Sequence, residues 1–295
     1  MNKKVFIILL NYNGYKDTLE AVKSLEKISY ENYKIVIVDN NSTDNSYNIL
    51  KEKLGEKHYI VQSGKNGGFA FGNNIGIKFA LDNDADYVLL INNDTTVKED
   101  FLDILVSTIE KKENIGLATG LILNYYDKDK IWFGGGDINW NKFFGMHIDE
   151  NKSIKEVSLK EGEITFATGC LMLIKSETLK SIGLLSEEYF MYYEDVDFCA
   201  NLQKNNYKIY YNPKSIIYHK ISAASGENES PFAIEWNTRN RIKFMKKYKG
   251  MVSKFKYIKT VIYFYLTRLI KILEYIFKGR NDKVSALLKG IFIKA

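Results

Sequence analysis

Two clusters of acidic and amide side chains in this sequence have the chemistry of metal binding and proton transfer. The first, Asn92-Asn93-Asp94, follows the apolar run 87–91. Hard divalent cations prefer carboxylate oxygens, so Asp94 is a candidate metal ligand, and Asn92 offers a weaker amide oxygen on the same face of an extended chain. An aspartate that caps the segment after residues 95 and 96 explains Asp94 equally well.

The second cluster is Glu194, Asp195 and Asp197, within the aromatic segment 190–198. An aromatic, partly dry setting raises the pKa of a carboxylate and can fit it for proton abstraction. Acidic residues also favour the first turn of a helix, and we adopt that interpretation for Asp197. Three carboxylates exceed what a helix start requires, so Asp195 is the candidate base.

Two further signals are weaker when each is taken alone. The segment 63–76 is rich in glycine, and such bare backbone can approach an anion or a nucleotide closely at a helix N-terminus. A tight turn explains these glycines equally well. His219 ends the strand-like run 215–219. A lone histidine in such a place is more often a hydrogen-bonded structural residue than a metal ligand.

Alternating strand and helix patterns over the first hundred residues predict an α/β fold with a mainly parallel sheet flanked by helices. Asp44 can cap the second helix, and Asn73 or Asn74 the third. The expected strands cover 5–11, 34–40, 59–63 and 87–92, and the expected helices cover 16–28, 44–54, 73–81 and 99–112. Farther along, the patterns predict a strand over 164–175, a strand pair over 207–219 and a polar loop over 222–230.

Each of the first four expected strands ends in polar residues. Ligands of open α/β sheets bind at the carboxyl ends of the parallel strands, where these ends meet at one rim. We therefore expect a single ligand site formed by 11–13, 39–41, 63–66 and 92–94.

Length and composition indicate an ordered globular protein. The chain has 295 residues, of which 45% are hydrophobic and 26% charged, enough for a substantial core. Cys170 and Cys199 form no metal or disulfide pattern, which suggests buried thiols in a reducing compartment. The apolar stretch near the N-terminus is short and runs into polar residues, so we interpret it as a strand rather than a signal peptide.

The C-terminal segment 241–295 differs in charge from the rest of the chain. Its 15 Lys and Arg against 2 acidic residues give it a net +13, and because the whole chain carries +6, residues 1–240 carry −7. Within it, 258–278 predicts an amphipathic helix too interrupted by charge to span a membrane. We expect it to lie in the plane of an anionic membrane surface. Docking on the catalytic domain or on a second copy of the chain, as in a homodimer, is the alternative.

Several motifs together resemble one known family. The segments NYNG, VDNNSTDNS, NGGFAFGNNIG, INNDT, ATGCLMLIKSETLKSIG, YFMYYEDVDFC and YHKISAAS occur in this order between residues 3 and 250. Their order and spacing resemble glycosyltransferase family 2, the inverting enzymes of GT-A fold, and in particular its rhamnosyltransferase-like branch. Such co-occurrence is far more specific than any single motif. The resemblance implies a GT-A fold with a Rossmann-like, mainly parallel sheet and a C-terminal amphipathic helical tail.

The resemblance also implies a role for individual residues. Asp94, in the triplet with Asn92 and Asn93, looks like the anchor of a metal bound to the diphosphate of a nucleotide-sugar, and His219 looks like a completing metal ligand. Asp195, with Glu194 beside it, looks like the base that deprotonates the acceptor. Asn11 and Asp39 look like residues that bind the nucleoside. The loop over the donor is matched by Asn66, Gly67, Gly68 and Asn74. A further family element, whose role does not follow from the sequence, is matched by Trp236, Arg239 and Asn240.

The resemblance also implies a specific function. It is transfer of a sugar, with inversion and with Mg²⁺ or Mn²⁺, from a nucleotide-sugar such as dTDP-rhamnose to a glycan or lipid-linked acceptor. The reaction would serve surface polysaccharide or glycolipid synthesis on the cytoplasmic face of the cell membrane. The expected domains are 1–240, catalytic, with a donor half 1–97 and an acceptor half 98–240, and the tail 241–295. Nucleic acid is not an expected partner, because the basic tail residues adjoin a wide apolar face.

Two other functional classes remain open from the sequence. Asn92 and Ser186 stand where the family usually has aspartate, and Asn201 where it usually has arginine. These departures allow a non-catalytic protein that binds nucleotide-sugars or glycans on the same fold. A sugar nucleotidyltransferase would share a related site, but the expected basic, glycine-rich signature near the first strand is missing from the sequence.

Overall fold

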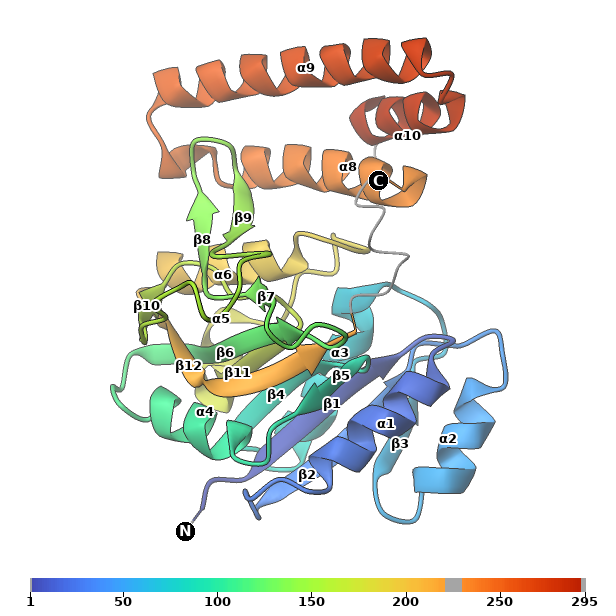
Figure 1. Cartoon of the computed structure of the whole chain (residues 1–295), viewed down its shortest axis with the longest axis vertical. Helices are drawn as coiled ribbons and strands as arrows, with labels where there is room; N and C mark the ends of the chain where they lie inside the picture. Colours follow the sequence, from blue (N-terminus) through green and yellow to red (C-terminus); the bar gives the residue numbers. More distant parts are fainter. Residues whose placement is uncertain (1, 221–229, 293–295) are drawn as a thin grey trace.

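A ten-stranded sheet runs through the middle of the molecule (Figure 1), in a computed structural model that describes residues 2–220 and 230–292. Its N-terminal half is parallel, in the spatial order β3-β2-β1-β4. All four expected strands are confirmed. They are β1 (Val5–Asn11), β2 (Tyr33–Asp39), β3 (Tyr59–Gln62) and β4 (Tyr87–Asn92). The apolar runs of β1, β2 and β4 are buried because helices cover both faces of a parallel sheet, whereas β3 at the edge is only half-buried.

The four expected helices of this half are also present. They are α1 (Tyr15–Leu25), α2 (Ser46–Leu54), α3 (Phe69–Asp82) and α4 (Phe101–Ile109). The N-cap of α2 is Asn45 rather than Asp44, although Asp44 Oδ1 does accept the N–H of Ser46 at 2.9 Å.

The start of α3 was predicted wrongly. The helix begins four residues earlier than expected, after Gly68, whose φ of 91° belongs to the region that favours glycine. Its first N–H, that of Phe69, donates to the carbonyl of Phe190 at 2.8 Å. Asn73 and Asn74 therefore lie inside the helix, each 2% exposed, and cap nothing.

Beyond residue 100 the sheet becomes mixed because one strand reverses direction. β11 (Leu171–Lys175) runs antiparallel between β4 and β6 (Ile115–Asn124). Its first residues therefore lie at the carboxyl rim of the parallel strands. There the backbone N–H of Asn92 donates to the carbonyl of Cys170 at 3.2 Å. The expected strand 164–175 is thus two separate strands, β11 and the short β10 (Gly162–Ile164).

The expected strand pair 207–219 is a single long strand, β12 (Lys208–His219). It runs parallel to β6, with a register irregularity between Asn212 and Ile216 that accommodates Pro213. The end of β12 pairs antiparallel with β5 (Thr95–Val97), and β7 (Ile131–Phe133) adds to β6. The expected polar loop 222–230 lies, except for its last residue, outside the described residues.

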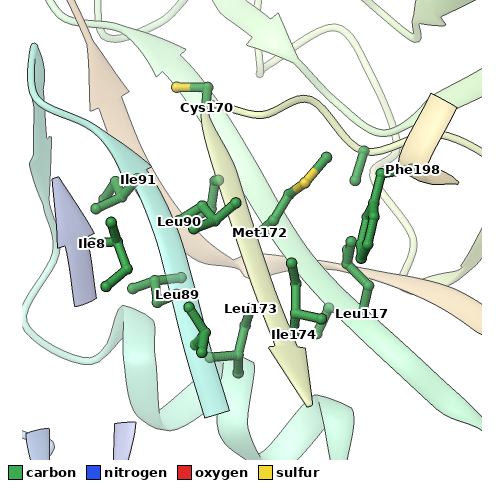
Figure 2. Close-up of a cluster of buried hydrophobic side chains, with 14 of the residues drawn as sticks. Ile8, Leu89, Leu90, Ile91, Leu117, Cys170, Met172, Leu173, Ile174 and Phe198 are labelled. Atoms are coloured by element: carbon green, nitrogen blue, oxygen red, sulfur yellow. The ribbon is translucent and has the colours of Figure 1, made fainter. Parts of the chain in front are cut away.

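The core lies at the junction of the two halves of the sheet. Figure 2 shows side chains of β4 and β11 side by side, with Leu117 of β6 next to Phe198 from α6 (Glu194–Lys204) and Cys170 at the rim end of β11. Ile8, Leu89, Leu90, Met172 and Leu173 are all fully buried there. This packing gives the rim a rigid base. Both cysteines are buried free thiols, as expected.

A separate layer packs beside the part of the sheet that follows residue 100. The hairpin β8–β9 (Gly136–Asn139 and Phe144–His147) rises toward three helices, of which α9 is the outermost (Figure 1). The helices are α8 (Pro231–Lys247), α9 (Lys254–Phe277) and α10 (Asn281–Phe292), with the short turn η1 (Lys249–Met251) before α9 and α5 (Ser176–Ile182) near the sheet. Since α8 continues through residue 240, the division into 1–240 and 241–295 stays a prediction.

Helix α9 leaves its apolar face exposed, whereas an amphipathic helix usually packs that face against the protein. The expected amphipathic helix is present, and Thr260, Phe264 and Tyr275 are its buried residues, with Thr260 Oγ1 donating to the carbonyl of Asn141 at 2.8 Å. Its apolar face is exposed, with Ile262, Leu269 and Ile270 at 55–64%. The polar residues Glu274 and Lys278 are exposed. In the described parts of the chain, no helix combines the length and apolar character that crossing a membrane requires.

Candidate active site

Strand pairing brings Asp94 and His219 together, although β6 and β11 separate β12 from β4 in the sheet. The turn 92–94 leads from β4 into β5, and Thr95 of β5 is the register partner of His219 at the end of β12. The carbonyl of Asp94 accepts the N–H of Lys220 at 2.9 Å, which fixes the turn against that strand end. As a result, Asp94 Oδ1 lies 3.1 Å from His219 Nε2.

The Asp94–His219 pair keeps unused hydrogen-bonding capacity. Asp94 Oδ1 is buried and close to His219 Nε2, but it accepts no hydrogen bond of acceptable geometry. His219 Nδ1 is also buried and has no hydrogen-bond partner. A buried polar atom without a partner is costly and rare, so this arrangement favours a ligand between or beside the two side chains. A carboxylate oxygen and an imidazole nitrogen both suit Mn²⁺, and carboxylate suits Mg²⁺.

The protein offers a divalent cation two ligands rather than a complete shell. No group of three or more His, Cys, Asp or Glu side chains within 2–220 and 230–292 could hold a metal ion. Mg²⁺ sites that include substrate phosphates need only one or two carboxylates, so the residues present fit a cation shared with a diphosphate. Asn92 lines the same cavity as His219.

Glu194 and Asp195 begin helix α6 at a strained turn. Tyr192 and Tyr193 before them both have positive φ, at 68° and 76°, which is uncommon for residues of this size. This turn lets Asp195 accept the N–H groups of Gly169, at 3.1 Å, and of Val196, at 2.8 Å. Gly169 precedes β11, so the reversed strand that lies beside β4 also anchors the acidic pair.

The pKa values of the acidic pair are raised. Burial raises the pKa of Asp195, although the N–H groups of Gly169 and Val196 and the nearby His147 act in the opposite direction. Burial raises the pKa of Glu194 well above its ordinary value, and the negative charge of Asp195 adds to this effect. Glu194 Oε2 is buried without a partner. A carboxylate with a raised pKa accepts a proton more readily, once it is ionised, than an exposed one does, which suits a general base.

Asn240 of α8 holds the strained turn in place. Its side-chain amide donates to the carbonyls of Met191, at 2.8 Å, and Tyr192, at 2.9 Å. The element at 236–240, whose role the sequence did not reveal, therefore positions the acidic pair. Arg239 beside it stacks on Trp236 at 4.7 Å and binds Glu235 on its own helix.

Asp197 has a different role from its two acidic neighbours. Its carboxylate accepts the hydroxyl of Tyr189 at 3.1 Å and pairs with Lys247 at 2.8 Å. It lies in the first turn of α6, as expected, and ties α6 to α8. Its carboxylate is thus occupied by protein contacts.

The reactive groups surround one cavity of about 530 Å³. The cavity extends from Asn92 and His219 on the rim to Asp195 and on to the wall formed by the β8–β9 hairpin, α8 and α9. Its aromatic wall residues are suited to stacking on sugar rings. They are Phe69, Trp132, Phe144, Phe166, Tyr192 and Tyr193.

Three cavity residues were missed by the sequence analysis. His147 ends β9, its Nδ1 lies 3.0 Å from the carbonyl of Trp132, and burial lowers its pKa. Arg241 and Arg268 come from α8 and α9. None of the three belongs to a recognisable motif. The only signal for Arg268 is a cation within the amphipathic helix, which is common at membrane surfaces for other reasons.

Asn11 and Asp39, predicted to bind the nucleoside, form a closed network. Both are fully buried at the ends of β1 and β2. The amide of Asn11 donates to Asp39 Oδ2 at 2.8 Å, and Asp39 also accepts the N–H and hydroxyl of Ser42, at 2.9 and 2.6 Å. Thr18 donates its hydroxyl to Asn11 Oδ1 at 2.9 Å. Contact with a nucleoside stays a prediction, and this network holds the rim together.

The other predicted donor residues are also engaged with protein. Asn93 donates its amide to the hydroxyl of Thr18 at 2.9 Å, and Asn66 Oδ1 accepts the N–H of Gly68 at 3.1 Å. A Cβ at Gly67 would lie 2.3 Å from the ring of Phe71, and one at Gly68 only 2.0 Å from the carbonyl oxygen of Phe190. Close packing thus explains both glycines, and their contact with a donor stays a prediction.

Asn74 lies away from the rim groups. Its side-chain amide donates to the carbonyl of Leu185 and to Glu187, both at 2.9 Å, and its oxygen accepts the N–H of Leu185 at 3.1 Å. It therefore fastens α3 to the turn 185–187, which is the place where the sequence departs from the family pattern. Its predicted donor contact stays a prediction.

Comparison with known proteins adds independent findings. The model of a family described as Glycosyl transferase family 2 matches residues 6–183. The rhamnosyltransferase WbbL of Escherichia coli K12 is 26% identical over 258 residues, which cover 82% of this chain and 93% of that protein. The dTDP-rhamnosyl transferase RfbF of Shigella flexneri is 24% identical, covering 84% of this chain and 81% of that one.

Solved structures share the fold at low sequence identity. A crystal structure of GalNAc-T7 with UDP, GalNAc and Mn²⁺ has a TM-score of 0.65 at 18% identity; the match covers 83% of this chain but only 48% of that longer one. The mannosyltransferase PcManGT of Pyrobaculum calidifontis, in complex with GDP-Man and Mn²⁺, has a TM-score of 0.60 at 14% identity, with coverage of 100% and 77%. These neighbours confirm the expected GT-A architecture.

Proposed function

Since the chain belongs to glycosyl transferase family 2 and is a hexosyltransferase-type glycosyltransferase, we propose that it transfers a sugar from a nucleoside diphosphate to an acceptor hydroxyl with inversion. The observation that carries this proposal is that one cavity is lined by both Asp195 and His219, whose Nε2 lies 3.1 Å from Asp94 Oδ1. One end offers unpaired ligands for a metal and a diphosphate. The other end offers a base for the acceptor.

Asp195 is the proposed catalytic base. Its two backbone donors, Gly169 and Val196, fix the carboxylate and leave lone pairs for the acceptor hydroxyl. Its raised pKa makes it a stronger proton acceptor than an exposed aspartate once it is ionised. A deprotonated acceptor oxygen that displaces the nucleoside diphosphate directly from the opposite face inverts the configuration at the anomeric carbon.

Asp94 and His219 are the proposed metal ligands. Their unpartnered buried atoms fit a cation whose remaining ligands come from the diphosphate and water. Mn²⁺ or Mg²⁺ bound there would neutralise the negative charge that develops on the leaving nucleoside diphosphate. Lys220, next in the chain, is held by Asp17 and Glu20, both at 2.7 Å, and so stabilises the strand end that carries His219.

A rhamnose donor and a surface glycan product are the proposed specificity. The support is the likeness to two proteins named as rhamnosyltransferases, at 26% and 24% identity. A Haloferax volcanii hexosyltransferase named for low-salt glycan biosynthesis, 28% identical, supports the broader class of glycan assembly. We therefore propose dTDP-rhamnose as the first donor to test and a glycan or lipid-linked saccharide as the acceptor.

We also propose that α9 holds the enzyme on the inner face of the cell membrane. Its exposed apolar face is continuous, and a cavity of about 470 Å³ beside it is lined by Lys142, Lys256 and Lys259 together with Phe255 and Tyr263. Apolar and basic side chains next to each other complement an anionic lipid surface better than they complement a neutral one.

Donor hydrolysis tests the proposed reaction. The purified full chain is incubated with dTDP-, UDP- and GDP-sugars with Mn²⁺, and again with EDTA, and release of the nucleoside diphosphate is measured. We expect metal-dependent release from one donor. Binding of nucleotide-sugars without release from any of them, with or without candidate acceptors, would favour the non-catalytic alternative.

Vesicle sedimentation tests the membrane surface. The full chain should sediment with phosphatidylglycerol vesicles and much less with phosphatidylcholine vesicles, and Ile262→Asp with Leu269→Asp should abolish the difference. If the chain stays in solution with both vesicles and sediments as a dimer by analytical ultracentrifugation, the face is an interface between two copies instead.

A further inference from the structure

Two arginines in the cavity wall lack an acidic partner. Arg241 of α8 and Arg268 of α9 line the same cavity as Asp195. Both guanidinium groups stack on the ring of Phe264, at 5.2 and 4.8 Å, and Arg241 also lies 5.3 Å from the ring of Phe144. No ion pair to either arginine occurs within residues 2–220 and 230–292.

The hydrogen-bonding groups of these arginines are largely unused. Arg241 donates its Nε–H to the carbonyl of Lys142 at 2.8 Å. Arg268 Nε is buried and has no partner. Burial lowers the pKa of both guanidinium groups, and the charge of Arg241 lowers that of Arg268 further. Arginine nevertheless remains charged in proteins, so two like charges share a half-buried wall, and no acidic side chain of the described residues forms an ion pair with either.

The surroundings of the arginines place them on the acceptor side of the base. Tyr193, Tyr263 and Tyr275 are among the groups that influence the pKa of the two guanidinium groups, and Arg241 is held at the hairpin turn by the carbonyl of Lys142. The helices that carry them pack above the β8–β9 hairpin, away from the strand rim (Figure 1). They are therefore not arranged around the proposed metal pair.

We propose that Arg241 and Arg268 form a subsite for a phosphate or diphosphate group carried by the acceptor. Two guanidinium charges without an acidic partner match a group of charge near −2 better than a single carboxylate, and the planar fork of arginine suits phosphate oxygens. The subsite belongs to the proposed transferase reaction, because it would orient the acceptor hydroxyl toward Asp195. It also gives α9 a second role, since its outer face is apolar and its inner face supplies Arg268.

Calorimetric titration of the full chain with inorganic pyrophosphate in EDTA tests this subsite without metal and without any nucleotide-sugar. We expect wild-type protein to bind and Arg268→Met to bind about tenfold more weakly or worse, because a charge-assisted hydrogen-bonding partner is lost. Lys254→Met, which removes an exposed charge from the same helix, should bind like wild type. Arg268→Lys should be intermediate, and it carries the comparison if Arg268→Met proves unstable by thermal melting.

Several outcomes would overturn the subsite. They are absence of pyrophosphate binding by wild type, unchanged binding by Arg268→Met and Arg268→Lys, an equal loss in Lys254→Met, or clearly tighter binding by Asp94→Asn. The last outcome would place the anion at the donor site, because without metal the Asp94 carboxylate repels an anion bound there. Failure of donor hydrolysis in the earlier assay leaves this titration unaffected, so the two proposals fail separately. Dodecyl phosphate binding more tightly than inorganic phosphate identifies a lipid-borne group, and equal binding identifies a soluble phosphorylated acceptor.

Discussion

The polar strand ends of this protein look alike in sequence but form two different kinds of region. At Asn11 and Asp39 each polar group has a protein partner, so the network is closed. At Asp94, His219 and Glu194, buried polar atoms have none. A closed network stabilises the fold, whereas an open one costs stability and is retained where a ligand completes it. For these residues, the hydrogen-bond partners rather than the residue type distinguish the two regions, and our proposal places the chemistry at the open one.

The largest effect should come from the base in the open region. Asp195→Asn keeps the shape of the side chain but cannot accept a proton, so we expect transfer to fall by about 10²- to 10⁴-fold. Steady-state transfer to an acceptor and calorimetric donor binding are measured together. Donor binding should stay close to wild type. Near-normal transfer by Asp195→Asn would remove this residue from the chemistry.

Next in size is the loss of a metal ligand. Asp94→Asn should raise the Mn²⁺ concentration needed for half-maximal donor hydrolysis by about 100-fold, because a charged oxygen ligand becomes a neutral one. A Mn²⁺ titration of hydrolysis measures it. Asn92→Ala is the matched comparison, since Asn92 borders the same cavity with a weaker ligand. An unchanged titration curve for Asp94→Asn would argue against this metal site.

The closed network should respond in stability. Asp39→Ala removes the acceptor of three hydrogen bonds and leaves donors on Asn11 and Ser42 without a partner. The free energy of unfolding should therefore fall by about 3 kcal/mol. Urea denaturation measures the change. Asp94→Ala, whose Oδ1 has no hydrogen bond, should change stability by less than about 1 kcal/mol. Equal losses in the two variants would erase the distinction between the regions.

The smallest effect is a shift along the pH axis. Asp195 must be ionised to accept a proton, and burial raises its pKa, so kcat/KM should be full above that raised value and fall as pH drops through it. The acid limb should therefore lie above the ordinary aspartate pKa of about 3.9. A pH profile of kcat/KM measures the limb. A limb at the ordinary value would show that the carboxylate is solvated during turnover.

Much of the fold could be predicted because its signals are local. β1, β2 and β4 are unbroken apolar runs, and α9 has an amphipathic pattern. The missed features depend on distant contacts. The early start of α3 depends on the carbonyl of Phe190, and the reversal of β11 depends on its neighbours β4 and β6. β12 stays one strand through Pro213 because the register shift absorbs the missing donor.

The candidate site could be predicted in part for the same reason. Asp94 and Glu194-Asp195 belong to short clusters, so their residue types suggested their roles and the resemblance suggested the same roles. Asn240, His147 and Arg268 lie far from these motifs in sequence, and only packing of the hairpin and α8–α9 brings them to the cavity. Sequence pattern could not separate Asp39 from Asp94 either, because both follow buried strands and their hydrogen-bond partners come from distant segments.

Crystals of the full chain grown with Mn²⁺ and dTDP, or with UDP or GDP, test the central claim most directly through the anomalous signal of manganese. We expect one peak within about 2.5 Å of both Asp94 and His219, with diphosphate oxygens completing its coordination. A manganese peak and diphosphate bound elsewhere in the molecule, with Asp94 and His219 unligated, would contradict the assignment of the open region as the reaction centre.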